Sequence, residues 1–268
     1  MARFIHGYNQ CFHTPWLSMS DQQLHDNLYF NKLEDISHFN FNEAVVNVFP
    51  DMIKRSVPGY STILGMIGDL ASRYVQPNSR CYDLGCSLGA ASIAIRSGIS
   101  ADNCLIVSVD NSSAMIERCE TVLHSTHPTA SHATPIRLVH DDIVNITIES
   151  ASMVVLNFTL QFISVDKRLL LLQKIYNGLL PGGILVLSEK VVFTDEPHQQ
   201  LMTELYHNFK RANGYSDLEI SQKRTALEAV MKPETLEMHK HRLKNVGFNS
   251  ADTWFQCMTF ASLIAIKT

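Results

Sequence analysis

The sequence predicts an α/β protein with a doubly wound, mostly parallel sheet, because short apolar strands alternate with helices along much of its 268 residues. The first strand runs into a turn that carries Gly85 and Gly89, and a helix of small residues follows. Three further apolar runs, at residues 104–110, 136–143 and 151–158, have a polar residue at or beside their ends. Ligands bind at the carboxyl ends of parallel strands, so these positions predict a small-molecule pocket.

The composition fits one enzyme domain that acts on a small molecule. Hydrophobic residues make up 46% of the chain, charged residues 18%, and no apolar run reaches the ~18–20 residues of a membrane span. The formal net charge of -4 provides no basic field for direct binding of nucleic acid. The six cysteines occur singly, without a Cys-x-x-Cys pair, which indicates a reducing cytoplasm.

The chain is expected to divide into an N-terminal extension, residues 1–40, that is partly disordered, and one domain over residues 41–268. Residues 1–18 lack the continuous apolar core of a secretion signal, and Met19 offers a second start site. We hypothesise that translation starts at Met19, and we expect a chain beginning there to fold and turn over normally. The intact mass of the native protein distinguishes the two starts.

The elements that flank the central strands have their own signals. Helical spacing covers residues 41–75 with a break at 57–60, where Ser61 is expected to cap the second helix and place Tyr60 at its entrance. A strand at 184–188 is followed by a helical cap insertion at about residues 195–235. Its helices are expected at 201–211 and 218–231. Two extended runs, 253–260 and 262–267, predict a C-terminal antiparallel hairpin at one edge of the sheet.

The glycine turn narrows the choice of ligand. Its spacing, Asp-x-Gly-x-x-x-Gly from Asp83 to Gly89, fits poorly with dinucleotide binding, and the acidic strand end favours a ligand with an ammonium group. Asp110 lies 25 positions after Gly85, close to the offset at which a carboxylate binds a ribose diol. Each polar strand end could instead be a helix N-cap, but four of them in register with a glycine turn favour a pocket.

Two other features carry weaker chemical signals. The histidines at positions 124, 127 and 132 are more typical of an exposed loop than of a metal site, so no metal is expected. Cys86 has no histidine placed beside it by the sequence, and a small side chain suffices at a tight turn, so it is not expected to be a nucleophile.

The strand ends and the hairpin resemble the class I S-adenosylmethionine-dependent methyltransferases, which have a Rossmann-like, seven-stranded sheet. Longer sequence segments are similar to the carboxy-S-adenosyl-L-methionine synthase family, and the similarity runs from about residue 41 to the C-terminus. These segments are FPDMI at 49–53, RSVPGY at 55–60, YDLGCSLGA at 82–90, MVVLNFTLQF at 153–162, FKRANGYS at 209–216 and EISQKR at 219–224. The chain departs from the family mainly at residues 1–40 and in a longer loop at 124–135.

The resemblance implies a role for each residue of the pocket. Gly85, Cys86 and Ser87 would approach the methionine end of S-adenosylmethionine, and Asp110 would hold the ribose hydroxyls. The other implied contacts are Asn111 beside the adenosine, Asp142 with the Ile143 backbone at the adenine edge, and Asn157 at the sulfonium.

A carboxylate next to the sulfonium requires a cationic partner. Taken alone, the residues leave Lys210, Arg211, Lys223 and Arg224 as candidates, and basic residues on a helix are usually solvated. The resemblance selects Arg224 as the catalytic carboxylate ligand, with Tyr60 closing the pocket. An arginine fork can bind both carboxylate oxygens, which lysine cannot do.

The reaction that the resemblance implies converts S-adenosyl-L-methionine and prephenate to carboxy-S-adenosyl-L-methionine, phenylpyruvate and water. The product would supply a separate tRNA carboxymethyltransferase for the 5-oxyacetic acid modification of wobble uridine, and the family implies a homodimer. Two alternatives stay open: an ordinary methyltransferase of a small molecule or tRNA, and a noncatalytic partner protein that binds S-adenosylmethionine. Incubation with prephenate separates them, because only the synthase yields a carboxylated product.

Overall fold

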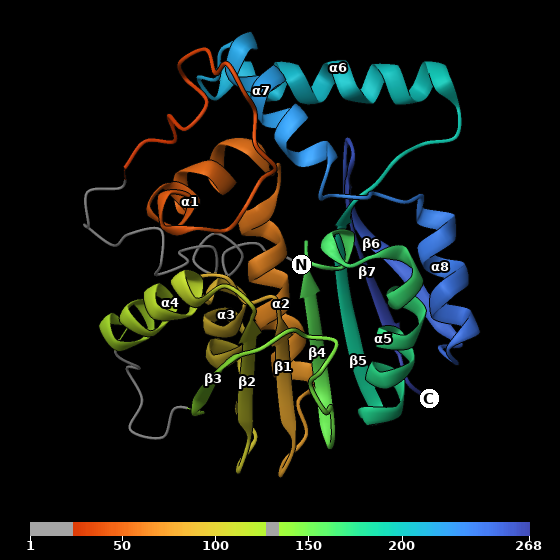
Figure 1. Ribbon diagram of the computed structural model, residues 1–268. Coiled ribbons are helices and arrows are strands. Elements are labelled where there is room, and N and C mark those ends of the chain that lie inside the picture. Colours follow the sequence, from red (N-terminus) through yellow and green to blue (C-terminus); the bar gives the residue numbers. More distant parts are fainter. Residues whose placement is uncertain (1–23, 127–133) are drawn as a thin grey trace, which may run out of the picture.

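The computed structural model describes residues 24–126 and 134–268, so the Met19 hypothesis and the histidines at 127 and 132 lie outside the described residues. A seven-stranded sheet with the order β3-β2-β1-β4-β5-β7-β6 runs through the molecule (Figure 1). The strands are β1 (Arg80–Leu84), β2 (Leu105–Asp110), β3 (Ile136–His140), β4 (Ala151–Asn157), β5 (Leu179–Lys190), β6 (Ser250–Cys257) and β7 (Phe260–Ile266). The first five strands pair in parallel, and β7 is antiparallel to both neighbours, which confirms the predicted fold class.

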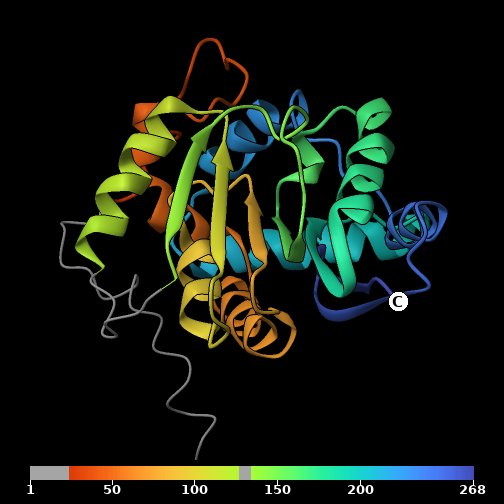
Figure 2. The same cartoon turned by 90° about the horizontal axis from the view of Figure 1, so that it is seen from below.

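Helices cover both faces of the sheet (Figure 2). They are α1 (Glu43–Ser56), α2 (Tyr60–Tyr74), α3 (Ala90–Gly98), α4 (Ser113–Ser125), α5 (Val165–Gly178), α6 (Glu196–Ala212), α7 (Asp217–Glu228) and α8 (Leu236–Asn245), with a short 3₁₀ turn at Leu160–Phe162. In β4, Met153 and Val155 pack with α2 and α3, whereas Val154 and Leu156 pack with α5 on the other face. Burial on both faces explains why this strand reads as a continuous apolar run.

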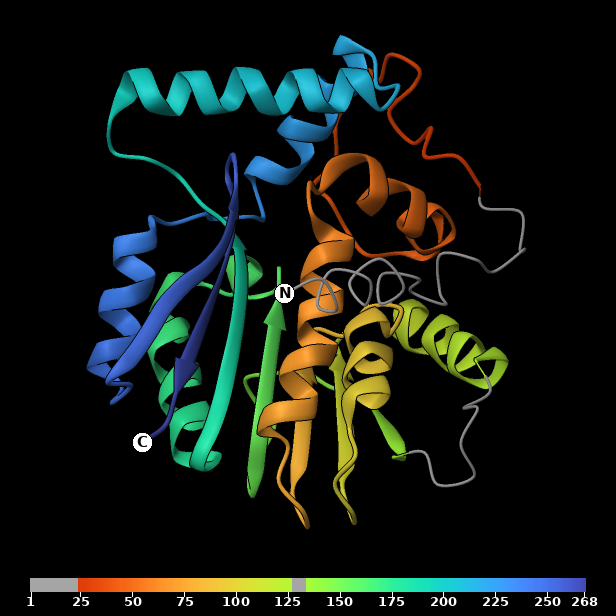
Figure 3. The same cartoon turned by 180° about the vertical axis from the view of Figure 1, so that it is seen from behind.

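Three helices, α1, α6 and α7, lie beyond the carboxyl ends of the parallel strands (Figures 1 and 3). A separate apolar cluster joins α1 and α7 to α4: Val46 and Met52 of α1, Met115 of α4 and Ala226 of α7 are buried together with Phe39. The residues before α1 therefore contribute to the packing of this cap.

Several predicted boundaries were wrong. Ser61 does not cap α2, because the helix begins at Tyr60 and its N-cap is Gly59, whose φ of 75° is left-handed. The strand β5 begins at Leu179 rather than at 184, since an irregular register lets Ala151 pair with Leu179 and Met153 with Ile184. Helix α6 begins at Glu196, where the Asp195 side chain accepts from the backbone N–H of His198 at 2.9 Å.

The C-terminal hairpin is confirmed, but its turn lies earlier than expected. Strand β6 ends at Cys257 and β7 begins at Phe260. Met258, in the turn between them, has a φ of 51°. Within the described residues, no helix is both long and apolar enough to cross a membrane.

Candidate functional site

One cavity of about 480 Å³ opens between the carboxyl ends of the strands and the cap. All ten residues predicted for the site line it: Tyr60, Gly85, Cys86, Ser87, Asp110, Asn111, Asp142, Ile143, Asn157 and Arg224. The fold thus brings together side chains that are spread over the whole domain. Their contacts with a ligand stay predictions.

The glycine turn after β1 is fixed to the neighbouring strand by its backbone. The N–H groups of Gly85 and Cys86 donate to the carbonyl oxygen of Val109 at 2.8 and 2.9 Å. Gly85 has a φ of 83°, and a Cβ there would lie 2.4 Å from two atoms of Thr159. Only glycine fits this position, because any side chain would be strained and would clash with the cavity wall.

Asp110 holds the same turn through its carboxylate. Its Oδ2 accepts from the Ser87 backbone N–H at 2.9 Å, and its Oδ1 accepts from the Ser112 N–H at 3.0 Å. Burial raises the pKa of Asp110, and these backbone donors act in the opposite direction. The N-cap of α4 is Ser112, whose side chain accepts from the Met115 N–H. Asp110 is therefore not the N-cap of this helix, and it lines the cavity.

The remaining predicted binding residues also follow strand ends. Asp142 accepts from the Val144 N–H at 3.0 Å, which folds the chain after β3 and buries the adjacent Ile143. Asn111 follows β2 directly, and its carbonyl oxygen lies 3.2 Å from Nε2 of His140. Each cavity position is thereby set by a local hydrogen bond at the edge of the sheet.

Tyr60 and Asp83 form the floor of the cavity near β1. Burial first, and then the charge of Asp83, raise the pKa of Tyr60, whereas a side-chain hydrogen bond with Asn157 lowers it. Burial raises the pKa of Asp83 to about 6, against a hydrogen bond from Ser92. Within the described residues, the other carboxylate oxygen of Asp83, Oδ1, is buried without a hydrogen-bond partner. An ammonium donor in the cavity would satisfy it.

Cys86 has the properties of a buried structural thiol. It is 5% exposed, and a hydrogen bond with the Cys119 thiol, followed by burial, raises its pKa. A thiol with a raised pKa is a poor nucleophile at neutral pH. Cys86 therefore fits the expectation that this tight turn needs only a small side chain.

Arg224 reaches the cavity from the cap helix α7. Its side chain is 57% exposed, and its Nε lies 3.4 Å from Oε1 of Glu228 one turn later. An exposed pair of this kind is worth about 0–1 kcal/mol, so the guanidinium can exchange this partner for a ligand carboxylate at little cost. The adjacent Lys223 is 4% exposed and is bound elsewhere.

Two further cations line the cavity, and sequence reasoning singled out only one of them. Lys210 of α6 was among the carboxylate candidates, but Lys190 at the end of β5 was missed. Burial lowers the pKa of both ammonium groups, for Lys210 to about 7. The predicted strand ended at residue 188, two positions before Lys190, so this lysine lacked the signal of a polar residue directly at an apolar strand end that identified Asp110 and Asn157.

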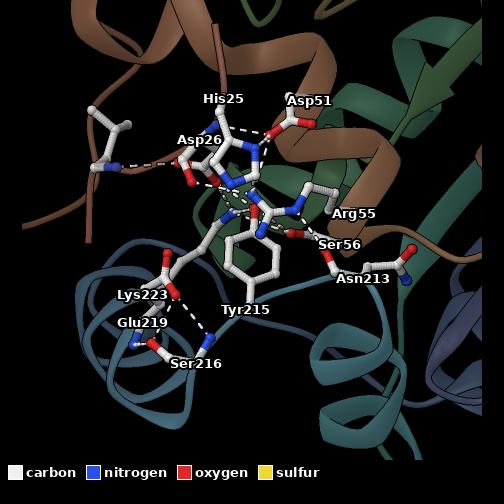
Figure 4. A network of polar contacts seen from close by, with 11 residues as sticks. His25, Asp26, Asp51, Arg55, Ser56, Asn213, Tyr215, Ser216, Glu219 and Lys223 are labelled. Carbon is white, nitrogen blue, oxygen red and sulfur yellow. Dashed lines mark hydrogen bonds and ion pairs between the residues drawn. The ribbon is translucent and has the colours of Figure 1, made fainter. Parts of the chain in front are cut away.

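A buried polar network fixes the cap to the segment before α1 (Figure 4). Asp26 lies at its centre, where its Oδ2 pairs with Nζ of Lys223 at 3.2 Å and accepts from the Tyr215 hydroxyl. Arg55 donates to the carbonyl oxygens of Asp26 and Asn213 at 3.2 and 2.7 Å, and its guanidinium lies 3.8 Å from the Tyr215 ring centroid. The network joins α1, the turn after α6, and α7.

Comparisons with known proteins agree with this architecture. A family described as a methyltransferase domain matches residues 82–183. A carboxy-S-adenosyl-L-methionine synthase of Trichlorobacter lovleyi is 59% identical over 242 residues, which cover 90% of this chain and 98% of that protein. One of Vibrio cholerae is 54% identical over 242 residues, covering 90% and 97%.

A solved structure supports the fold alone. Human N-acetylserotonin methyltransferase in complex with S-adenosylmethionine superposes with a TM-score of 0.56 at 17% identity, over 84% of this chain and 55% of that chain.

Proposed function

The chain belongs to the carboxy-S-adenosyl-L-methionine synthase family, and we propose that its second substrate is prephenate, the source of the carboxyl group. The synthase activity uses S-adenosylmethionine. The proposed products are carboxy-S-adenosylmethionine, phenylpyruvate and water.

The cation-lined roof of the cavity is the observation that carries this proposal. Lys210 and Arg224 of the cap, with Lys190 at the end of β5, line the same cavity as the acidic strand ends below them. The acidic floor suits a cationic ligand, since Asp83 Oδ1 lacks a partner among the described residues and can accept from the methionine ammonium group. The basic roof suits an anionic one, and prephenate carries two carboxylates. Transfer of a methyl group to a neutral acceptor would not require such a roof.

The proposed chemistry balances without another reactant. The carbon–carbon bond to the ring carboxylate of prephenate breaks, the ring becomes aromatic, and hydroxide leaves. The sulfonium makes the methyl protons of S-adenosylmethionine acidic, and hydroxide takes one of them to form water. The resulting carbanion attacks carbon dioxide, so that a new carbon–carbon bond forms and the methyl group becomes carboxymethyl.

The protein supplies positioning and charge in this scheme. Asp110 and the glycine turn would hold the ribose and the methionine end, which places the methyl group under the cap. The Arg224 fork would bind both oxygens of the new carboxylate, and Tyr60 would close the space around the sulfonium. Exclusion of water matters, because a carbanion in contact with solvent would be protonated before it reacted.

Mass spectrometry of the S-adenosylmethionine pool tests the proposed function. The protein is incubated with S-adenosylmethionine and prephenate, and a product heavier by one carbon dioxide is expected, with phenylpyruvate in equal amount. Formation of S-adenosylhomocysteine with an added acceptor would instead identify a methyltransferase. Absence of turnover with prephenate would refute the assignment of the carboxyl source.

The cellular role is proposed on the same basis. We propose that the product supplies a separate tRNA carboxymethyltransferase for the 5-oxyacetic acid modification of wobble uridine, in the cytoplasm. The net charge of -4 supports a division of labour in which this chain does not bind RNA itself. We also propose a homodimer, and light scattering on the purified protein measures its mass.

A further inference from the structure

Two lysines from different elements lie against one tyrosine at the border between sheet and cap. Nζ of Lys190, at the end of β5, lies 5.0 Å from the ring centroid of Tyr206, and Nζ of Lys210 lies 4.7 Å from it. Both Tyr206 and Lys210 belong to α6 and are buried, and all three side chains line the cavity. The ring face attracts each ammonium group, but the charge of Lys190 also lowers the pKa of Lys210, so the two groups repel each other and a bound anion would offset this repulsion.

The charges around the cavity leave these two lysines unmatched. Lys223 is paired with Asp26, and Arg224 with Glu228. Among the described residues, no carboxylate lies within ion-pair distance of Lys190 or Lys210, although at longer range Glu228 acts on Lys190 and Asp26 acts on Lys210. Burial, together with the neighbouring cations, lowers the pKa of both lysines and of His207 beside them.

We propose that Lys190 and Lys210 form the subsite for the side-chain keto-acid carboxylate of the dicarboxylic substrate. This inference rests on the proposed function and assigns its second anionic group. Prephenate has one carboxylate on its ring, which leaves as carbon dioxide, and one on its pyruvyl side chain, which stays in phenylpyruvate. The ring carboxylate must lie beside the methyl group and Arg224, so the other carboxylate requires an anion site of its own.

The geometry suits a carboxylate of this kind. The two ammonium groups come from β5 and from α6 and line the same cavity, so an anion bound by both would link the sheet to the cap. Tyr206 packs with Phe260 at a centroid distance of 5.1 Å, and together they provide an apolar surface beside the charges for a six-membered ring.

Steady-state kinetics of Lys190→Met and Lys210→Met test the subsite. A charge-assisted hydrogen bond contributes about 1.5–3 kcal/mol, so each substitution should raise the KM for prephenate roughly 10- to 150-fold. Inhibition by the product phenylpyruvate, which keeps only the side-chain carboxylate, should weaken by the same factor. Lys210→Arg should recover part of the loss. The affinity for S-adenosylmethionine, measured by calorimetry, should stay unchanged.

The controls separate the subsite from other roles. Lys244→Met removes an exposed charge on α8 and should leave every parameter unchanged. Equal losses for S-adenosylmethionine and prephenate would mean that the lysines bind the methionine carboxylate, and unchanged phenylpyruvate inhibition would also overturn the proposal. If the wild-type protein makes no carboxylated product, the proposed function fails. If it does so but the variants keep the normal KM, only the subsite fails.

Discussion

Replacement of Asp26 by alanine should destabilise the cap far more than an ordinary loss of an ion pair. Asp26 is 1% exposed and Lys223 is 4% exposed, so the substitution leaves an ammonium group buried without its carboxylate. Removal of one partner of a buried pair costs about 3–5 kcal/mol. Burial already lowers the pKa of Lys223, and Asp26 opposes that shift, so the variant should lose part of the charge on Lys223 as well. The free energy of unfolding should therefore fall by about 3–5 kcal/mol.

Urea unfolding of a double-mutant cycle measures this coupling. Asp26→Ala, Lys223→Met and the double variant are compared with wild type, and the double variant should be clearly more stable than the sum of the single losses indicates. Asp252→Ala is the matched control, because Asp252 is 90% exposed and pairs with Lys240 at 2.9 Å. A surface pair of this kind should cost about 0–1 kcal/mol.

Either of two results would contradict the expected coupling between Asp26 and Lys223. Asp26→Ala could unfold within about 1 kcal/mol of wild type, as a surface pair does, or the double variant could show strictly additive losses. A functional readout accompanies the stability: Arg224 directly follows Lys223 on α7, so loosening of this helix should weaken binding of carboxy-S-adenosylmethionine more than that of S-adenosylmethionine.

Three further predictions concern the cavity itself. Asp110→Ala should weaken S-adenosylmethionine binding roughly 10- to 150-fold in calorimetry, because it removes charge-assisted bonds of about 1.5–3 kcal/mol, and unchanged affinity would exclude the ribose role. Arg224→Leu should penalise carboxy-S-adenosylmethionine by about 2–5 kcal/mol and largely spare S-adenosylmethionine, with partial recovery in Arg224→Lys; equal losses would reassign the carboxylate. The pKa of Lys210 is lowered from 10.5 to about 7, so the prephenate KM should rise as the pH increases through 7. Between about pH 7 and pH 10.5 Lys210 is protonated in the unfolded chain but not in the folded one, so the free energy of unfolding should rise with pH in this range; the destabilising effect of the lysine is greatest below pH 7. A KM for prephenate that does not depend on pH, or the same KM profile in Lys210→Arg, would contradict the role of Lys210.

The sheet and one side of the cavity could be predicted because their signals are local. The apolar run of β4 is buried on both faces, and a run of that kind has few other interpretations. Gly85 needs a left-handed backbone and has no room for a side chain, so the requirement is visible in the residue itself. Polar residues at strand ends then converge by topology, which needs no knowledge of side-chain contacts.

The contacts of the cap could not be predicted, because they join residues that are distant in the chain. Asp26 and Lys223 are separated by 197 positions, and neither carries a local sign that it is buried. Lys190 and Lys210 reach the same Tyr206 ring only because α6 passes over the end of β5 (Figure 1). A buried lysine looks the same as a solvated one in sequence, and solvated lysines are far more common.

The network around Asp26 also shows what two of the sequence segments that carry the family resemblance do in the fold. RSVPGY begins with Arg55 and FKRANGYS ends beside Tyr215, and in the fold the guanidinium of the first lies on the ring of the second. Gly214 between them has a φ of 88°, and a Cβ there would lie 3.4 Å from Arg55 Nη2. The turn after α6 must therefore wrap closely around Arg55, while Arg55 binds its Asn213 carbonyl oxygen. The two segments and Asp26 form one structural unit. This unit holds α7, which carries Arg224, above the carboxyl ends of the strands.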